Sequence, residues 1–141
     1  MRILGLDYGD KTIGVAVSDP FGWTAQGVEI IRRENPAEYK KSLRRLGELI
    51  EEYHAEAIVL GYPKNLDNSE GERCEKTKAF CERLKNRFPK TEVVLWDERF
   101  STVAAERALR EANLSHGQRK RVIDKMAAVH ILQGYLDSRS K

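Results

Sequence analysis

Apolar residues in the first third of the chain form short, almost continuous runs. Residues 2–8, 12–18 and 24–31 have the length of strands, and the second run is rich in β-branched residues. Gly, Asp and Pro residues interrupt the pattern at positions 9–11 and 19–22, as in tight connections between antiparallel strands. The pattern therefore predicts an antiparallel meander of three strands.

The apolar period becomes helical after Asn35. This residue suits the N-cap of a helix, Pro36 suits the first helical position, and Glu38 can complete the capping arrangement. One face of the predicted helix is apolar and consists of Tyr39, Leu43, Leu46, Ile50 and Tyr53. A fourth strand is expected to follow at residues 57–61.

The rest of the chain predicts three helices and one more strand. A capping box at residues 69–72 opens the first of these helices, and the strand is expected at residues 92–96. Ser101 or Thr102 can cap a short alanine-rich helix. A second capping box, at residues 115–118, opens the C-terminal helix.

This order of elements predicts an α/β fold. Strands that are separated by helices pair in parallel through right-handed crossovers, so we expect a mixed five-stranded sheet. The sheet would join the antiparallel meander to parallel strands and would carry helices on both faces. With 141 residues, the chain is expected to form a single domain, residues 1–141. Functional residues of such sheets gather at the carboxyl ends of the parallel strands.

The composition is that of a soluble globular protein, with 40% hydrophobic and 33% charged residues. No apolar run approaches the roughly 20 residues of a membrane span. The N-terminal segment reaches Asp7 before a secretory signal could develop, so we expect a cytoplasmic protein without a membrane partner. Cys74 and Cys81 lie seven residues apart on a predicted helix, which puts their Cα atoms about 10.5 Å apart. That distance excludes a disulfide, and both are interpreted as core residues.

Charge is distributed unevenly along the chain. The net charge is +3, but residues 115–141 carry six basic and two acidic residues, a net charge of +4 that leaves −1 for the rest. A basic C-terminal segment on a mildly acidic body would suit a polyanionic partner. A solvated surface is the more common explanation of such a run, so charge alone does not decide the function.

Three acidic residues are distinguished by their positions. Asp7 ends the first predicted strand, Glu98 follows the fifth, and Asp124 lies on the C-terminal helix. The small residues Ala127 and Ala128 follow Asp124 on the same helix face and would allow close approach to the sheet. If the strands are near neighbours, these carboxylates converge.

Converging carboxylates repel one another unless cations lie between them. Mg²⁺ or Mn²⁺ suits such oxygen ligands, and two ions about 4 Å apart form the arrangement that hydrolyses phosphodiesters. We therefore predict that Asp7, Glu98 and Asp124 are both the catalytic residues and the ligands of a two-ion site. Each acid alone also has a structural explanation: a hairpin cap for Asp7, an ion pair with Arg99 or Lys125 for Glu98, and solvent exposure for Asp124.

Several polar residues near these acids are candidates for contacts with a nucleic-acid backbone. They are Lys11, Lys64, Asn65, Arg73 and Arg99, together with Arg119, Lys120 and Arg121. Each alone could equally serve solubility, and Asn65 could close a turn. Tyr8 and Tyr62 could stack on bases but are expected to belong to the core. His130, in an apolar stretch without a second histidine, is interpreted as a core residue.

Four blocks of the sequence, in this order, resemble the YqgF family of RNase H-like proteins, also called RuvX. The blocks are residues 5–9 with 13–16, residues 61–65, residues 97–102, and residues 123–136. The resemblance implies an RNase H-like fold, a metal-dependent nuclease triad at Asp7, Glu98 and Asp124, and maturation of the 5′ end of the 16S ribosomal RNA precursor. The chain departs from the family at residues 66–68, where a glycine is usual near the third position.

Three other functions compete with this prediction. An actin-like ATPase also uses an Asp-x-Gly hairpin, but it closes two domains around ATP, and Val15 occupies the lysine position of a phosphate-binding loop. A non-catalytic RNA-binding module would keep the fold without turnover. A resolvase of four-way DNA junctions would share the chemistry and require a two-fold dimer. We expect structured ribosomal precursor RNA as partner, with branched DNA as the alternative, and a monomer or weak homodimer.

Overall fold

The computed structural model describes residues 2–9, 11–35, 38–62, 72–97 and 116–139, the side chains of 72–73 and 116–125 excepted. In this part of the chain, five strands and three helices are formed. The strands are β1 (Arg2–Tyr8), β2 (Thr12–Ser18), β3 (Ala25–Arg32), β4 (Ala55–Tyr62) and β5 (Glu92–Asp97). The helices are α1 (Tyr39–Tyr53), α2 (Glu72–Arg87) and α4 (His116–Arg139).

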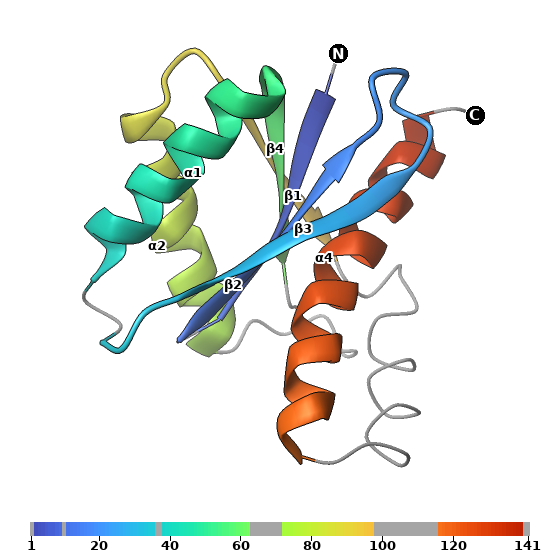
Figure 1. Cartoon of the computed structure of the whole chain (residues 1–141). Coiled ribbons are helices and arrows are strands. Elements are labelled where there is room, and N and C mark those ends of the chain that lie inside the picture. The colour runs from blue at the N-terminus through green and yellow to red at the C-terminus, as the bar shows by residue number, and fades with distance from the viewer. Residues whose placement is uncertain (1, 10, 36–37, 63–71, 98–115, 140–141) are drawn as a thin grey trace.

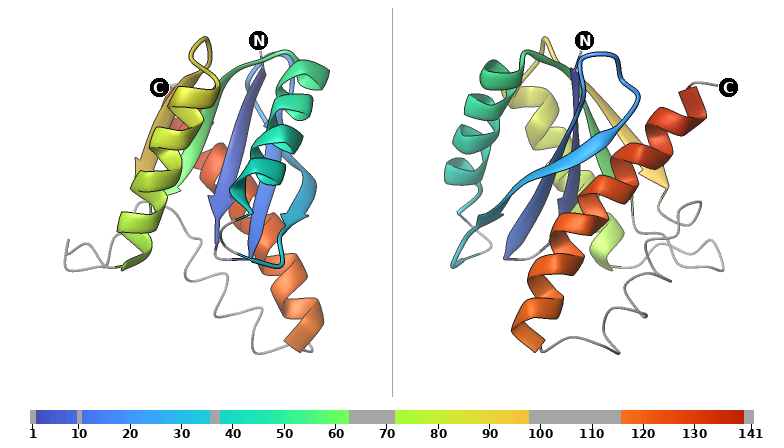
Figure 2. Two further views of the ribbon diagram at one scale, coloured as in Figure 1. Left: turned by 90° about the vertical axis from the view of Figure 1, so that its left-hand side faces the viewer. Right: turned by 45° about the vertical axis from the view of Figure 1, so that its right-hand side comes forward.

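The five strands form one mixed sheet in the order β3-β2-β1-β4-β5. The pairs β1–β2 and β2–β3 are antiparallel, whereas β1–β4 and β4–β5 are parallel. Helices α1 and α2 cover one face of the sheet and α4 crosses the other (Figures 1 and 2). The predicted meander, parallel strands and coverage of both faces are therefore confirmed.

Strand alternation divides the buried side chains into two cores. The core beneath α1 and α2 includes Leu4, Leu6, Ile13, Val15, Leu43, Leu46, Leu49, Ile58, Leu60, Phe80, Cys81 and Leu84. The core beneath α4 consists of Ile3, Ala16, Ala57, Val59, Ala127, Ala128, Ile131, Leu132 and Leu136. Along β1, Ile3 and Gly5 therefore belong to the α4 side, and Asp7 continues this alternation.

Helix α4 packs directly against the backbone of β1 at Gly5. A Cβ atom on Gly5 would lie 2.6 Å from the Cβ of Leu132 and 3.2 Å from the carbonyl oxygen of Ala128. Real side chains do not tolerate the first distance, so only glycine fits here. Ala127 and Ala128 are fully buried, as the close approach predicted from these small residues requires.

The predicted cap of α1 is wrong. The helix begins at Tyr39, with Glu38 in the N-cap position and no side-chain capping bond. The Glu38 N–H instead donates to the backbone oxygen of Asn35 at 2.9 Å, so Asn35 starts a turn before the helix. The Glu38 N–H therefore bonds to the backbone oxygen of Asn35, whereas the side chain of Asn35 was expected to accept this bond.

The other predicted elements agree to within a few residues where they are described. β4 extends beyond the expected strand at both ends, and α2 ends at Arg87, so Phe88 follows the helix. The expected helix after Thr102 and the capping residues Ser69 and Ser115 lie outside the described residues. No helix in the described part is long and apolar enough to cross a membrane.

Both cysteines are free and buried on α2, as predicted. Burial raises the pKa of the Cys81 thiol, which lowers its thiolate fraction. We expect thiol reagents at pH 8 to label the folded protein at least about 100-fold more slowly than the unfolded chain, because reaction requires opening of the helix. Mass spectrometry of pulse-labelled protein measures both rates, and fast labelling of the folded state would contradict the packing of α2.

Candidate active site

The parallel strands β1, β4 and β5 end at one edge of the sheet. Gly61 pairs with Trp96 and Tyr62 pairs with Asp97, while β1 ends at Tyr8 beside the hairpin that leads to β2. The ends of three strands that are distant in sequence therefore lie next to one another along this carboxyl edge. Tyr62 is buried here and Tyr8 packs against the core, as expected for both.

Asp7 is the acidic residue that the structure places inside this edge. It pairs with Gly14 of β2 and retains only 6% of its exposed surface. Burying a carboxylate costs several kcal/mol unless hydrogen-bond donors or cations compensate for the lost hydration. A residue with only a packing role would therefore not be expected to be an aspartate at this position. Its place in the alternation of β1 assigns it to the α4 side of the sheet.

The orientation of α4 relates Asp7 to the N-terminal half of this helix. The Gln133 amide accepts a bond from the Ala25 N–H at 3.0 Å and donates to the Trp23 carbonyl at 2.9 Å, at the opposite edge of the sheet. Ala128 lies over Gly5 in the middle of β1. Earlier turns of α4 therefore run toward the edge that holds Asp7, and Asp124 occupies the position one turn before Ala128.

The end of β5 also has a defined alternation. Trp96 packs against the core beneath α4, where its ring meets Tyr135 edge-on at 5.8 Å between centroids. Val93, an odd number of residues away from Trp96, packs on the opposite face, against the core beneath α1 and α2. Asp97 is four residues from Val93, so it lies on the same face as Val93 and on the face opposite to Asp7. Glu98 lies outside the described residues.

The structure describes only some of the predicted site residues completely. Asp7 and Lys11 are described, and Lys11 is exposed just after the β1–β2 hairpin. Arg73 lies at the start of α2, and Arg119, Lys120, Arg121 and Asp124 lie in the first half of α4, with undescribed side chains. Lys64, Asn65, Glu98 and Arg99 lie outside the described residues. The meeting of all three acids therefore stays a prediction.

The described side chains contain no cluster of three or more His, Cys, Asp or Glu residues that could hold a metal ion. His130 is half-buried on α4, in the apolar stretch where it was expected. The predicted metal ligands Glu98 and Asp124 do not belong to the described side chains.

Arg33 is a structural residue of the site that the sequence did not reveal. It is 5% exposed, its guanidinium donates to the Gly9 carbonyl, and its Cζ lies 4.7 Å from the Tyr8 ring centroid. Tyr8 in turn stacks on Phe80 of α2, with 4.2 Å between centroids. Arg33 thus fixes the hairpin that follows Asp7. The alternation of β3, continued past Arg32, is the signal that could have indicated an inward arginine.

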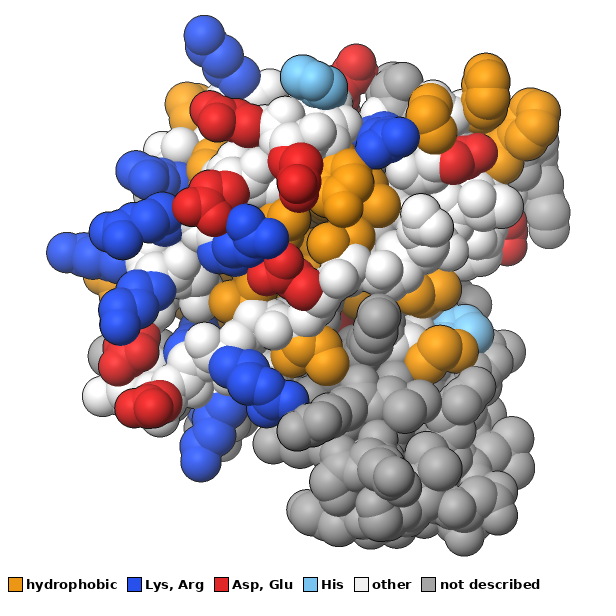
Figure 3. Space-filling model, viewed as in Figure 1, with side chains coloured by type: hydrophobic (Ala, Val, Ile, Leu, Met, Phe, Trp, Pro, Cys, Tyr) orange, Lys and Arg blue, Asp and Glu red, His pale blue; other side chains and the backbone are white. Residues whose placement is uncertain are grey.

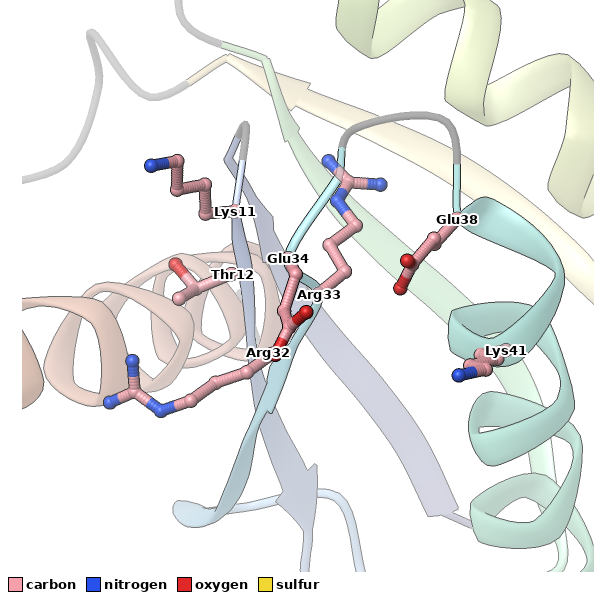
Figure 4. Close-up of a pocket in the computed structure, with 7 residues that line it drawn as sticks. All are labelled: Lys11, Thr12, Arg32, Arg33, Glu34, Glu38 and Lys41. Carbon is pink, nitrogen blue, oxygen red and sulfur yellow. The ribbon is translucent and has the colours of Figure 1, made fainter.

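A cavity of about 700 Å³ lies next to this hairpin (Figure 4). Its lining comes from the start of β2, the end of β3 and the first turn of α1. The lining residues are Lys11, Thr12, Arg32, Arg33, Glu34, Glu38 and Lys41. Lys11 is the one candidate nucleic-acid contact whose described side chain lines it.

Comparison with known families and structures agrees with the fold and with the four sequence blocks. The family model described as RuvX, Holliday junction resolvase, matches residues 1–138. A protein of Agathobacter rectalis is 56% identical over 137 residues, covering 97% of this chain and 95% of its own. A protein of Desulforamulus reducens is 55% identical over 141 residues, covering 100% of both chains. Both carry the name "Putative pre-16S rRNA nuclease".

Among solved structures, RuvC of T. thermophilus in complex with a Holliday junction substrate superimposes with a TM-score of 0.62. The alignment covers 99% of this chain and 96% of RuvC at 16% sequence identity. At this identity, the similarity establishes that the two proteins share the RNase H-like fold.

Proposed function

Because the chain belongs to the RuvX family, we propose that it is a metal-dependent nuclease that processes the 5′ end of pre-16S ribosomal RNA. The observation that carries the proposal is the buried Asp7 carboxylate at the carboxyl edge of the sheet. The names of the full-length relatives support ribosomal precursor RNA as substrate. A cytoplasmic location follows from this substrate.

Asp7, Glu98 and Asp124 are the proposed ligands of Mg²⁺ or Mn²⁺. Carboxylate oxygens are the donors that these hard cations prefer, so the residue types fit the ions. When bound, a pair of such ions supplies a hydroxide nucleophile and stabilises the charge of an in-line displacement at phosphorus. The place of Glu98 is supported by sequence, since it follows Trp96 by two residues, and that of Asp124 by its position before Ala128.

The chain contributes a rigid frame to this chemistry. Asp7 belongs to a strand with neighbours on both sides, and the bond from Arg33 to Gly9 holds the connection that follows it. Close packing of α4 on Gly5 fixes the distance between the helix and β1. A site held in this way needs little reorganisation when substrate binds.

The proposed contacts with the nucleic-acid backbone are chosen from their positions in the sequence. They are Lys11, Lys64, Asn65, Arg73, Arg99, Arg119, Lys120 and Arg121. Lysine and arginine bind phosphates largely irrespective of base sequence, so these residues would position the strand while the acids act on it.

Resolution of four-way DNA junctions is the second candidate function. The family description and the junction-bound RuvC support it. Symmetric cutting requires two active sites related by a two-fold axis, whereas the proposed processing of RNA is compatible with a monomer or weak homodimer.

The substrate and the metal requirement can be tested together. Purified protein should cut labelled 5′-extended 16S precursor RNA with Mn²⁺ or Mg²⁺ and should lose this activity in a chelator, because both charge stabilisation and the nucleophile depend on the ions. A synthetic four-way junction serves as competing substrate. Paired nicks in the junction with intact RNA would favour resolution, and RNA binding without cutting under every metal condition would favour a non-catalytic module.

A further inference from the structure

The charges on α1 oppose the helix dipole. Three exposed cations occupy its first half, namely Lys40, Lys41 and Arg44, and its exposed acids Glu48, Glu51 and Glu52 occupy the second half. Helices are stabilised by the reverse arrangement, with acids near the N-terminus. Figure 3 shows Lys and Arg side chains gathered along the α1 and α2 side of the molecule. Stability of the helix therefore does not explain these cations.

Three of the four cations that line the cavity beside the hairpin form no ion pair with a described residue. Among the residues that the structure describes, Lys11, Arg32 and Lys41 form no salt bridge, although Glu34 and Glu38 line the same cavity. Arg45, on the outward side of the same helix, pairs instead with Glu29 at 2.6 Å and Glu48 at 2.8 Å. The contrast indicates that the cavity cations are available to an external anion.

The cavity has a fixed wall and a charged rim. Its four cations and two acids give it a net charge of +2. Arg33 is held by the Gly9 carbonyl and the Tyr8 ring and so belongs to the wall. Lys11 and Arg32 extend on one side of the chain that joins β3 to α1, and Lys41 lies on the α1 side (Figure 4). A strand that passes over this segment would meet Lys11 and Arg32 on one side of it and Lys41 on the other.

The cavity lies at the same edge of the sheet as Asp7. Gly14 pairs with Asp7, and Thr12, which lines the cavity, is two residues nearer the hairpin on the same strand, or about 7 Å away along it. Arg32 pairs with Thr12 one strand farther out. A nucleic-acid strand that crosses the carboxyl edge would therefore reach the cavity a short distance beyond the scissile bond.

We propose that this cavity, through Lys11, Arg32 and Lys41, binds backbone phosphates of the nucleic-acid strand outside the catalytic centre. The proposal rests on the proposed function, since it takes nucleic acid as the ligand. It adds Arg32 and Lys41 to the contacts predicted from sequence. It extends the binding surface from the acids to the outer strand β3 and the start of α1.

The test compares two double variants that each remove two positive charges. Arg32→Gln with Lys41→Gln changes the cavity, and Arg87→Gln with Lys90→Gln changes exposed cations near the start of β5, at the opposite edge. Fluorescence anisotropy of labelled 5′-extended precursor RNA, in chelator and at several NaCl concentrations, gives the affinity and its salt dependence. Thermal unfolding of each variant checks that it is folded.

We expect the cavity variant to bind RNA about 5- to 20-fold more weakly than the wild type at low salt. Its salt slope should fall by about 0.7 to 1.4, since each phosphate that a protein neutralises on a single strand adds about 0.7 to the slope. The RNA affinity of the control variant should stay within about twofold of that of the wild type, because its substitutions change the net charge but not the cavity. Equal losses in both variants, or no loss in the cavity variant, would overturn the proposal.

Two further arms separate the possible failures. Inorganic phosphate that raises the unfolding temperature of the wild type but not of the cavity variant, while both proteins bind RNA equally well, would identify a free-phosphate site and refute strand binding. The binding assay contains no metal, so it measures RNA affinity independently of cleavage. If the cavity binds RNA in this assay but the protein never cuts RNA when metal is added, the result contradicts the proposed function alone. A wild type that binds neither RNA nor a four-way junction would overturn both proposals.

Discussion

Replacing Asp7 by Asn is expected to reduce RNA cleavage at least about 1000-fold while leaving RNA affinity within about threefold of the wild type. The substitution keeps the shape of the side chain but removes the negative charge that a divalent cation requires. A 1000-fold loss corresponds to about 4 kcal/mol of transition-state stabilisation, in the range that a metal ion supplies. Single-turnover cleavage and anisotropy measure the two quantities separately.

The same substitution also tests metal binding separately from cleavage. Asp7 is 6% exposed, and asparagine keeps the shape of its side chain. Urea unfolding without metal checks that the variant is folded. Added Mn²⁺ should raise the unfolding temperature of the wild type by mass action, and this increase should be absent in the variant.

Asp137→Asn is a matched control on the exposed face of α4. Asp137 accepts a bond from Gln133 at 3.0 Å, which an asparagine oxygen can also accept. Cleavage and the Mn²⁺-dependent increase in unfolding temperature should both persist in this variant. Cleavage by Asp7→Asn at wild-type rate would refute the role of Asp7, and cleavage that also resists chelator would indicate another nuclease in the preparation.

Residue periodicity predicted the fold because each core depends on local alternation. Ile3 and Gly5 differ from Leu4 and Leu6 in the face they occupy, and this division follows directly from a period of two. The sequence also predicted the close approach of α4 from Ala127 and Ala128. The predicted cap at Asn35 was wrong because the side chain and the backbone oxygen of Asn35 compete for the same Glu38 N–H. Residue types alone do not select between these two acceptors.

The site was predictable only as far as it depends on strand ends. Asp7 lies at the end of a buried strand, so its place at the carboxyl edge could be deduced from sequence. The alternation of β3 could have indicated that Arg33 faces inward, but its contacts could not be deduced, because they involve Tyr8 of β1 and, through it, Phe80 of α2, which are distant in sequence. The cavity cations were missed for the same reason: Arg32 and Lys41 come to line one cavity only because the fold brings the end of β3 and the start of α1 together.

Replacing Gly5 by Ala is expected to destabilise the protein by about 3 kcal/mol. The added methyl group would lie 2.6 Å from the Cβ of Leu132 and 3.2 Å from the Ala128 carbonyl oxygen. Both atoms are fixed to the helix, so no rotation of a side chain relieves the overlap, and α4 must move away from the sheet. Overpacking of this kind costs about 1–3 kcal/mol and occasionally more. Urea unfolding measures the loss.

The displacement of α4 also links this substitution to catalysis. Asp124 belongs to the helix that must shift, whereas Asp7 stays on β1, so the proposed ligands would separate even in molecules that remain folded. We therefore expect cleavage by Gly5→Ala, measured at a temperature where the variant is folded, to fall at least about tenfold, since small misplacements of catalytic groups are costly.

Gly47→Ala on α1 provides the contrast. Its added Cβ would meet Phe88 Cε1 at 3.2 Å, the edge of a ring that can shift, and alanine is favoured over glycine within a helix by about 1 kcal/mol. This variant should be as stable and as active as the wild type. If Gly5→Ala also kept both properties, the contact between α4 and β1 could not be what sets the geometry of the acids, and the position of Asp124 would require another explanation.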